Sequence, residues 1–259
     1  MTPRSLEAVA TPAPSLQDTA PARGAELPAS GRSAAAQAGE SACPLALRGV
    51  SKRWRKDLPL VLDELDLTLE PGTMTWIGGR NGVGKTTMLR IAAGLIEADT
   101  GRAEVWGVSA RENRTRYQEL VSFLPAGDRG LYARLTVRRQ LEFSGHLALV
   151  PRARLRTAVE EAIAEFDLRE LAERRVDRIS MGQRQRLRLA MTFLPVPEIV
   201  LLDEPLTSLD GEGAALLERA LQQLIAREGA VLWCSPSGEQ LDIHFDARFT
   251  IEHGRLVAA

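Results

Sequence analysis

Short apolar segments separated by turns begin near residue 45 and lead into segments with helical periodicity. The apolar positions predict strands over 45–50, 61–69 and 74–77, with acidic residues alternating in the second. The third predicted strand leads into a glycine-rich turn and then into an apolar helix over 85–93. This part of the chain therefore predicts strands that end in a strand, turn and helix unit.

Residues 136–193 are predicted to be mostly helical. Val159, Ile163 and Phe166 recur at a spacing that places them on one face of a helix, and Pro151 marks a break between two helices. The segment is therefore expected to be a helical insertion into the domain that the strands build.

A continuous apolar run over 199–202 ends in Asp203 and Glu204. This pattern is typical of a strand that is buried on both faces and carries its chemistry at its carboxyl end. A helix over 213–227, a strand over 230–234 and a hairpin that pairs 249–252 with 255–257 are predicted to follow. The simplest interpretation is one α/β domain with a helical insertion.

The N-terminal segment has a different composition. Residues 1–43 are rich in Ala, Pro, Ser and Gly and include no aromatic residue, so they cannot bury enough apolar surface to offset the entropy of ordering. We expect a disordered tail, and a spacer is favoured over a targeting peptide because no amphipathic Arg pattern appears. The folded domain is expected over 44–259, with a helical subdomain at about 135–178.

Charge and composition exclude several classes of function. The 259 residues include 33 Lys and Arg and 34 Asp and Glu, for a net charge of −1, and no basic block suggests a nucleic-acid partner. Only three of the basic residues are Lys: Lys52, Lys56 and Lys85. Cys43 and Cys234 lie far apart and fit neither a metal site nor a disulfide framework, which favours a reducing, cytoplasmic compartment.

The chain is not expected to cross a membrane by itself. Its longest apolar run, over 189–202, is interrupted by Pro195, Pro197 and Glu198, and the N-terminus has no continuous apolar signal core. Any role at a membrane therefore requires a partner.

Residues 79–86 match the phosphate-binding pattern G-x-x-x-x-G-K-[ST] and lie between a predicted strand and a predicted helix. Glycines let the backbone aim N–H groups at phosphate oxygens, Lys85 is expected to reach the β- and γ-phosphates, and Thr86 to bind Mg²⁺. A chance match in a glycine-containing turn is the alternative. The candidate ATP-binding residues of this segment are Gly79, Arg80, Asn81, Gly82, Val83, Gly84, Lys85, Thr86 and Thr87.

Two carboxylates at the end of the strand over 199–202 are expected to face this loop. Asp203 is predicted to hold Mg²⁺ through the water shell of the metal, and Glu204 to deprotonate the water that attacks the γ-phosphate. The alternative is a pair of solvated acids at a strand end. Beside a phosphate loop, Glu204 is the predicted catalytic residue.

Residues 179–186, together with Ser208, Leu209 and Asp210, resemble the ATP-binding subunits of ABC transporters. The signature sequence of that family is LSGGQ, and Ser180, Gly182 and Gln183 match it while Met181 replaces a Gly. The resemblance implies a P-loop NTPase fold with a β-rich N-terminal part and a helical subdomain. It covers residues 45–257.

The resemblance also implies an ATP site shared between two chains. Each ATP would lie between the phosphate loop of one chain and Ser180, Gly182 and Gln183 of the other, with Asp210 in the loop that crosses the interface. Trp54 falls where the family places an aromatic ring that stacks on adenine; a core or surface Trp is the alternative. The dimer is expected to be either homomeric or heteromeric.

Two positions depart from the family pattern. Ala126 stands where the family has a Gln that touches Mg²⁺ and the attacking water, and Pro236 stands where it has a His that binds the γ-phosphate. His244 lies eight residues further on and is not expected to substitute. Since Glu204 is intact, a slow or partner-dependent ATPase is predicted.

The segment over 127–137 resembles the corresponding segment of bacterial exporter subunits. It implies export through a separate membrane-spanning permease subunit, with this chain bound peripherally at the cytoplasmic face of the inner (cell) membrane. Cargo selection would then belong to the permease. One alternative is a soluble ABC-type ATPase that clamps nucleic acid; the other is a regulatory subunit that binds ATP with little hydrolysis.

Overall fold

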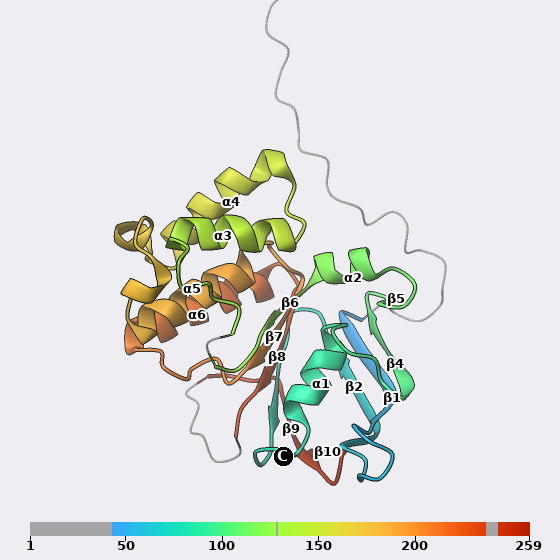
Figure 1. Ribbon diagram of the computed structural model, residues 1–259. Helices are drawn as coiled ribbons and strands as arrows, with labels where there is room; N and C mark the ends of the chain where they lie inside the picture. Colours follow the sequence, from blue (N-terminus) through green and yellow to red (C-terminus); the bar gives the residue numbers. More distant parts are fainter. Residues whose placement is uncertain (1–42, 128, 237–242) are drawn as a thin grey trace, which may run out of the picture. The chain divides into compact units, whose positions relative to one another are not determined.

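An antiparallel sheet of four strands forms the first part of the fold, in the order β2-β1-β4-β5 (Figure 1). Its strands are β1 (Leu45–Lys52), β2 (Leu62–Leu69), β4 (Thr100–Val105) and β5 (Val108–Ser109). The computed structural model describes residues 43–127, 129–236 and 243–259. The tail predicted over 1–43 lies outside these residues apart from Cys43.

A second sheet of six strands carries the loops of the candidate site. Its order is β10-β9-β3-β8-β7-β6, and all neighbouring pairs are parallel except the terminal hairpin of β9 and β10. The carboxyl ends of β3, β6, β7 and β8 therefore meet at one edge. The strands are β3 (Met74–Gly78), β6 (Val121–Leu124), β7 (Ile199–Asp203), β8 (Ala230–Cys234), β9 (Ala247–Glu252) and β10 (Arg255–Ala258).

Helices cover both faces of the six-stranded sheet (Figure 1). The predicted break is confirmed, because Pro151 is the N-cap of α4, and Val159, Ile163 and Phe166 are all buried on the predicted face. The helices are α1 (Lys85–Ala92), α2 (Arg114–Leu120), α3 (Val137–Leu147), α4 (Arg152–Glu165), α5 (Met181–Phe193) and α6 (Gly211–Ala226), with 3₁₀ turns at Arg169–Leu171 and Val176–Arg178.

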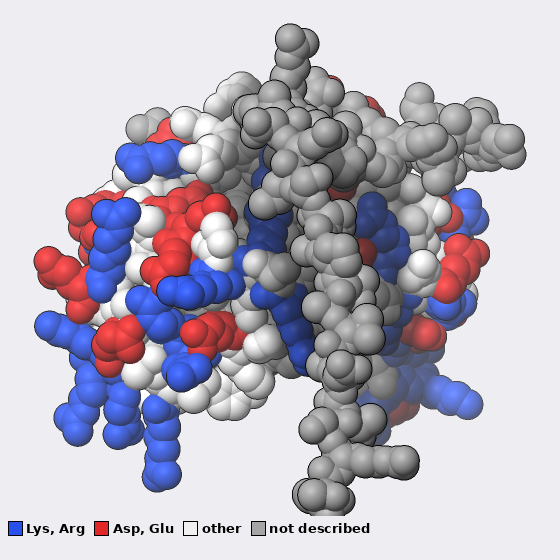
Figure 2. Space-filling view, turned by 90° about the horizontal axis from the view of Figure 1, so that it is seen from above, with Lys and Arg blue, Asp and Glu red and all other residues white. Residues whose placement is uncertain are grey.

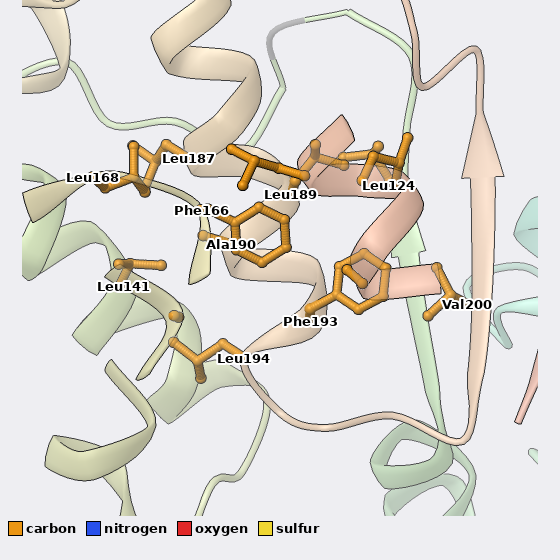
Figure 3. Close-up of a cluster of buried hydrophobic side chains, with 14 of the residues drawn as sticks. Leu124, Leu141, Phe166, Leu168, Leu187, Leu189, Ala190, Phe193, Leu194 and Val200 are labelled. Carbon is orange, nitrogen blue, oxygen red and sulfur yellow. The ribbon is translucent and has the colours of Figure 1, made fainter. Parts of the chain in front are cut away.

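Strand β7 separates two hydrophobic cores, as its unbroken apolar sequence predicts. Val200 and Leu202 face a core built with α3, α4, α5 and α6, whereas Ile199 and Leu201 face a core built with α1 and the four-stranded sheet. Figure 3 shows α5 in the first of these cores, with Phe193 lying toward Val200. Helix α5 therefore packs on the sheet and on α3 and α4 at once. Because the core is close-packed, a displacement of α5 would move its contacts with the sheet and with these two helices.

The structure corrects several predicted boundaries and adds elements that were not predicted. Strand β1 runs two residues beyond its predicted end, to Lys52, and β9 begins two residues before its predicted start, at Ala247. Helix α6 begins at Gly211, two residues before the predicted start, because the Asp210 side chain caps it by accepting the N–H of Gly213 at 2.7 Å. The added elements are β4, β5, α2 and β6. None of the helices in the described ranges has the length and apolar character that crossing a bilayer demands.

Candidate nucleotide-binding site

The phosphate loop joins β3 to α1, as predicted, and its geometry requires glycine. Gly84 has a φ of 119° and is the N-cap of α1. A Cβ at this position would lie 2.9 Å from the carbonyl oxygen of Val61, so no side chain fits there. Because Gly84 has no side chain to cap the helix, the first N–H groups of α1 are left for an anion.

Lys85 is held inside the loop that precedes it. The side chain is only 6% exposed, and its Nζ donates to the carbonyl oxygens of Gly79 at 2.6 Å and Arg80 at 3.2 Å. These bonds place a positive charge on the concave side of the loop. A phosphate group would attract the ammonium away from the two carbonyls, because hydrogen bonds between charged partners are the stronger ones.

Thr86 and Asp203 form the pair expected at a Mg²⁺ site. The Thr86 hydroxyl donates to Asp203 Oδ2 at 2.8 Å. The backbone N–H of Ala126 lies near enough to this carboxyl to lower its pKa. Burial raises the pKa of the Asp203 carboxyl, while the bond from Thr86 and the charge of Lys85 act in the opposite direction. A hydroxyl and a carboxylate beside a phosphate loop are the hard oxygen ligands that Mg²⁺ selects, so these residues fit the metal.

Glu204 follows Asp203 at the sheet edge in a strained conformation. Its φ is 51°, in the left-handed region that residues with side chains rarely adopt. Its N–H donates to the carbonyl oxygen of Cys234 at 2.8 Å, which ties this turn to the end of β8. The backbone of the half-buried Glu204 is thereby fixed directly after Asp203. Strain of this kind is typical of functional positions.

The predicted signature residues form the N-terminus of α5. The Ser180 side chain accepts the N–H of Gln183 at 3.2 Å, and Gln183 Oε1 accepts the N–H of Ser180 at 2.9 Å, which completes a capping box. In the described part of the chain, the N–H groups of Met181 and Gly182 donate to no protein acceptor. These two donors suit an anion, whereas the Gln183 side chain is already used in the cap.

The loop after β7 packs directly against this helix start. A Cβ at Gly182 would lie 3.5 Å from the Ser208 carbonyl oxygen, and the Ser208 hydroxyl lies 3.2 Å from Met181 Sδ. Asp210 accepts two bonds from Arg186, which also pairs with Asp167 and Glu212. The hydrogen bond from the Gly213 N–H lowers the pKa of the Asp210 carboxyl most, and the bonds from Arg186 lower it further. Asp210 therefore holds the loop against α5.

Three further sequence-predicted positions are placed as follows. Trp54 is 50% exposed, with Lys52 Nζ 5.9 Å from its ring centroid, so the ring is open to stacking. Pro236 follows β8 at the edge of the site, next to Ser235, whose hydroxyl accepts the Trp76 indole N–H at 2.9 Å. The exposed His244 lies 3.7 Å from Asp246 and not in this cluster.

Sequence reasoning missed two buried polar side chains of α5, Gln185 and Arg188, which are 4% and 3% exposed. They contact the loops that follow β7 and β6, respectively. Their signal in the sequence is weak. It consists only of two long polar residues at a helical spacing among Leu187, Leu189 and Ala190.

Asp203→Asn is expected to stabilise the chain in the absence of nucleotide by about 1 kcal/mol, or about 2–4 °C in melting temperature. The buried carboxylate is disfavoured in the folded state, whereas Asn is neutral and its oxygen can accept the same bond from Thr86. A carboxyl whose pKa is raised by folding lowers the stability of the folded state once the pH rises above the pKa that the group has in the unfolded chain. The gain should therefore be present at about pH 8 and reduced at about pH 4 in thermal unfolding. A pH-independent effect would contradict this account.

Comparison with known proteins identifies the family of this chain. The family described as ABC transporter matches residues 62–207. The chain is 30% identical over 215 residues to the ABC transporter ATP-binding protein NatA of Bacillus subtilis (strain 168), covering 82% of this chain and 87% of NatA. A dimeric ATP-binding cassette solved with ADP and Pi superposes with a TM-score of 0.72 at 19% identity, covering 82% of this chain and 96% of that one.

Other relatives differ in what their names say they do. The chain is 32% identical over 197 residues to the daunorubicin resistance ATP-binding protein DrrA3 of Streptomyces coeruleorubidus, and covers 62% of it. It is 33% identical over 179 residues to the Fe(3+) ions import ATP-binding protein FbpC of Escherichia coli (strain K12), and covers 49% of it. These alignments include 76% and 69% of this chain, and the chain spans less than two thirds of the length of either relative. The predicted fold class is confirmed, and the chain belongs to the family of ABC transporter ATP-binding proteins.

Proposed function

We propose that this chain binds ATP with Mg²⁺ and hydrolyses it as the ATP-binding subunit of a transporter. The observation that carries the proposal is the Thr86–Asp203 pair, which joins the phosphate loop to the strand end that also bears Glu204. A phosphate loop alone fits any nucleoside triphosphatase. A carboxylate that follows the metal ligand directly supplies the base that hydrolysis needs.

Each residue has a distinct part in the proposed reaction. The N–H groups of the loop and of the α1 N-terminus bind phosphate oxygens, and Lys85 turns from the Gly79 carbonyl to the phosphates. Thr86 and Asp203 hold Mg²⁺, which neutralises charge on the phosphates when it is bound. Glu204 orients a water molecule and accepts its proton as the water attacks the γ-phosphate.

A second copy of the domain completes the proposed site. The unpaired N–H groups of Met181 and Gly182 lie at the start of α5, and they have no acceptor in the described part of their own chain. They would bind the γ-phosphate of an ATP held by the partner's phosphate loop. The dimeric form of the superposable structure with ADP and Pi supports this arrangement. Trp54 would stack on the adenine.

Slow turnover is part of the proposal. Ala126 contributes only its N–H to the site, and Pro236 offers no N–H and no polar side chain. Neither can position water or the γ-phosphate by a side chain. The same two residues favour a second candidate function, an ATP-binding regulatory subunit with little hydrolysis.

The transport role rests on a separate membrane-spanning permease, with this chain at the cytoplasmic face of the inner membrane. Export is favoured by the resemblance over 127–137 and by a relative that is a drug resistance protein, although an import protein also matches. A nucleic-acid clamp is disfavoured. In the left part of the face that Figure 2 shows, acidic and basic side chains lie side by side, and the chain as a whole has a net charge of −1.

Mixing two inactive variants tests the shared site. Lys85→Met disables the phosphate loop and Gly182→Glu places a negative charge at the start of α5, so either homodimer is expected to fall to roughly one hundredth of the wild-type rate. A mixed dimer keeps one intact site, composed of the loop of one chain and the α5 start of the other. An equal mixture should therefore recover about a quarter of the wild-type rate.

The controls separate the candidate functions. Wild-type chain diluted over a wide range should lose specific activity if dimer formation limits the rate, and Glu204→Gln sets the background. The shared site would be contradicted if the mixture recovered no ATPase activity while the wild-type rate stayed well above background. A wild-type chain that binds ATP but hydrolyses it no faster than Glu204→Gln would favour the function of a regulatory subunit.

A further inference from the structure

Two buried polar residues of α5 form a chain of hydrogen bonds at the back of the site. Arg188 is 3% exposed, and its Nη1 donates to Gln185 Oε1 at 2.6 Å. Gln185 Nε2 in turn donates to the carbonyl oxygen of Pro205 at 2.9 Å. Arg188 Nη2 donates to the carbonyl oxygen of Pro125. One helix therefore holds the loop after β6 and the loop after β7 by their backbones.

Both carbonyls belong to residues next to the candidate reacting groups. Pro125 precedes Ala126, whose backbone N–H lies near enough to the Asp203 carboxylate to lower its pKa. Pro205 follows Glu204, whose backbone is in the strained left-handed region. The Pro125 carbonyl and the Ala126 N–H are parts of the same peptide unit, which is planar, so a bond that fixes one fixes the other.

Burying an arginine is costly unless its geometry is well satisfied. The cost of burying Arg188 is compensated by its bonds to the Pro125 carbonyl, which lies 63 residues away in the sequence, and to Gln185. Ala126 is the second residue after β6 and has no polar side chain that could fix this part of the loop. The guanidinium of Arg188 holds the backbone of this loop instead.

We propose that Arg188 is a positioning residue for the metal-binding carboxylate. From α5 it holds the Pro125 carbonyl, and with it the peptide whose N–H lies near the Asp203 carboxylate. Through Gln185 it also ties the same helix to the turn that bears Glu204. This inference rests on the proposed function of Asp203 and Glu204. It also makes the α5 helix, which starts at Ser180, part of the support of both carboxylates.

The test compares two arginines of α5 with the same substitution. Arg188→Met removes the bond to Pro125, whereas Arg184→Met, one turn earlier, removes a bond to the carbonyl of Val176 in the helical part. In the full chain with ATP, Arg188→Met is expected to weaken Mn²⁺ affinity about tenfold and to lower kcat about tenfold. Arg184→Met should stay within about twofold of wild type in both. The KM for ATP should stay within about twofold in each variant.

Amide hydrogen exchange of Ala126 gives a readout without nucleotide. Its exchange should accelerate about tenfold in Arg188→Met and hardly change in Arg184→Met. Arg188→Lys keeps a charged donor and should lie between wild type and Arg188→Met in Mn²⁺ affinity and in Ala126 exchange, even if Arg188→Met unfolds.

Unchanged Ala126 exchange and Mn²⁺ affinity in the folded Arg188 variants would overturn the inference. Equal losses in Arg184→Met and Arg188→Met would also overturn it, because they would indicate a general weakening of α5. A wild-type chain that never hydrolyses ATP would instead contradict the proposed function, and Ala126 exchange would still decide the role of Arg188.

Discussion

Glu204→Gln is expected to lower the steady-state ATPase rate of the full chain at least about 100-fold, because a positioned general base contributes about 10²–10⁴ to a rate. Gln has the same shape and keeps the Glu204 backbone N–H on the Cys234 carbonyl, so the strained turn is retained. ATP affinity should stay within about twofold of wild type, since the amide removes the base and not the phosphate contacts.

Glu218→Gln is the matched control, because Glu218 is exposed on α6 and bonds only to Gln222 in the described part of the chain. Phosphate release measures the rate, and equilibrium binding of a fluorescent ATP analogue measures affinity. A Glu204→Gln chain that keeps more than about a tenth of the rate would rule out Glu204 as the base.

Lys85→Met is expected to weaken ATP affinity at least about 100-fold, or about 3 kcal/mol. The ammonium is buried and bonded to two carbonyls of the phosphate loop, so it already lies where phosphate charge would arrive. Each hydrogen bond to a charged group contributes about 1.5–3 kcal/mol, and Met fills similar volume without any donor. Titration calorimetry with ATP in the presence and absence of Mg²⁺ measures the loss.

Lys56→Met serves as the control for this variant, because Lys56 is exposed and is one of only three lysines in the chain. Its ATP affinity should equal that of wild type. Circular dichroism must show that Lys85→Met remains folded. A folded Lys85→Met chain that binds ATP as wild type does would contradict the assignment of the phosphate loop.

The strands that flank the site could be predicted because they are buried on both faces. Strand β7 has five buried residues in succession, and β8 is equally buried. Such strands can be predicted from the sequence because they occur as unbroken apolar runs. Strand β4 was missed because three of its six residues are exposed and its sequence begins with Thr, Gly and Arg. Helix α2 has seven residues and depends on a cap from Asn113, which no periodicity over such a length reveals.

Chemistry that lies within one turn of chain was readable, whereas chemistry between distant segments was not. Lys85 and Thr86 belong to a pattern of eight neighbouring residues, and Asp203 follows directly from its strand. The bond from Arg188 to Pro125 spans 63 residues, and it exists only because α5 packs beside the end of β6. The capping box of Ser180 and Gln183, by contrast, lies within one turn and matches the S-x-x-Q pattern, so it was readable from the sequence although it was not predicted.

The capping box at the start of α5 has a consequence for how two chains would meet. Both of its hydrogen bonds form within one chain, between Ser180 and Gln183, so this turn loses its conformational freedom when the chain folds and not when a partner arrives. Preorganised contacts of this kind strengthen association by reducing its entropic cost. In the proposed shared site, the helix start would therefore meet the anion in a conformation that is already fixed. Discrimination between a nucleoside triphosphate and a diphosphate then depends on whether the terminal phosphate reaches that helix start.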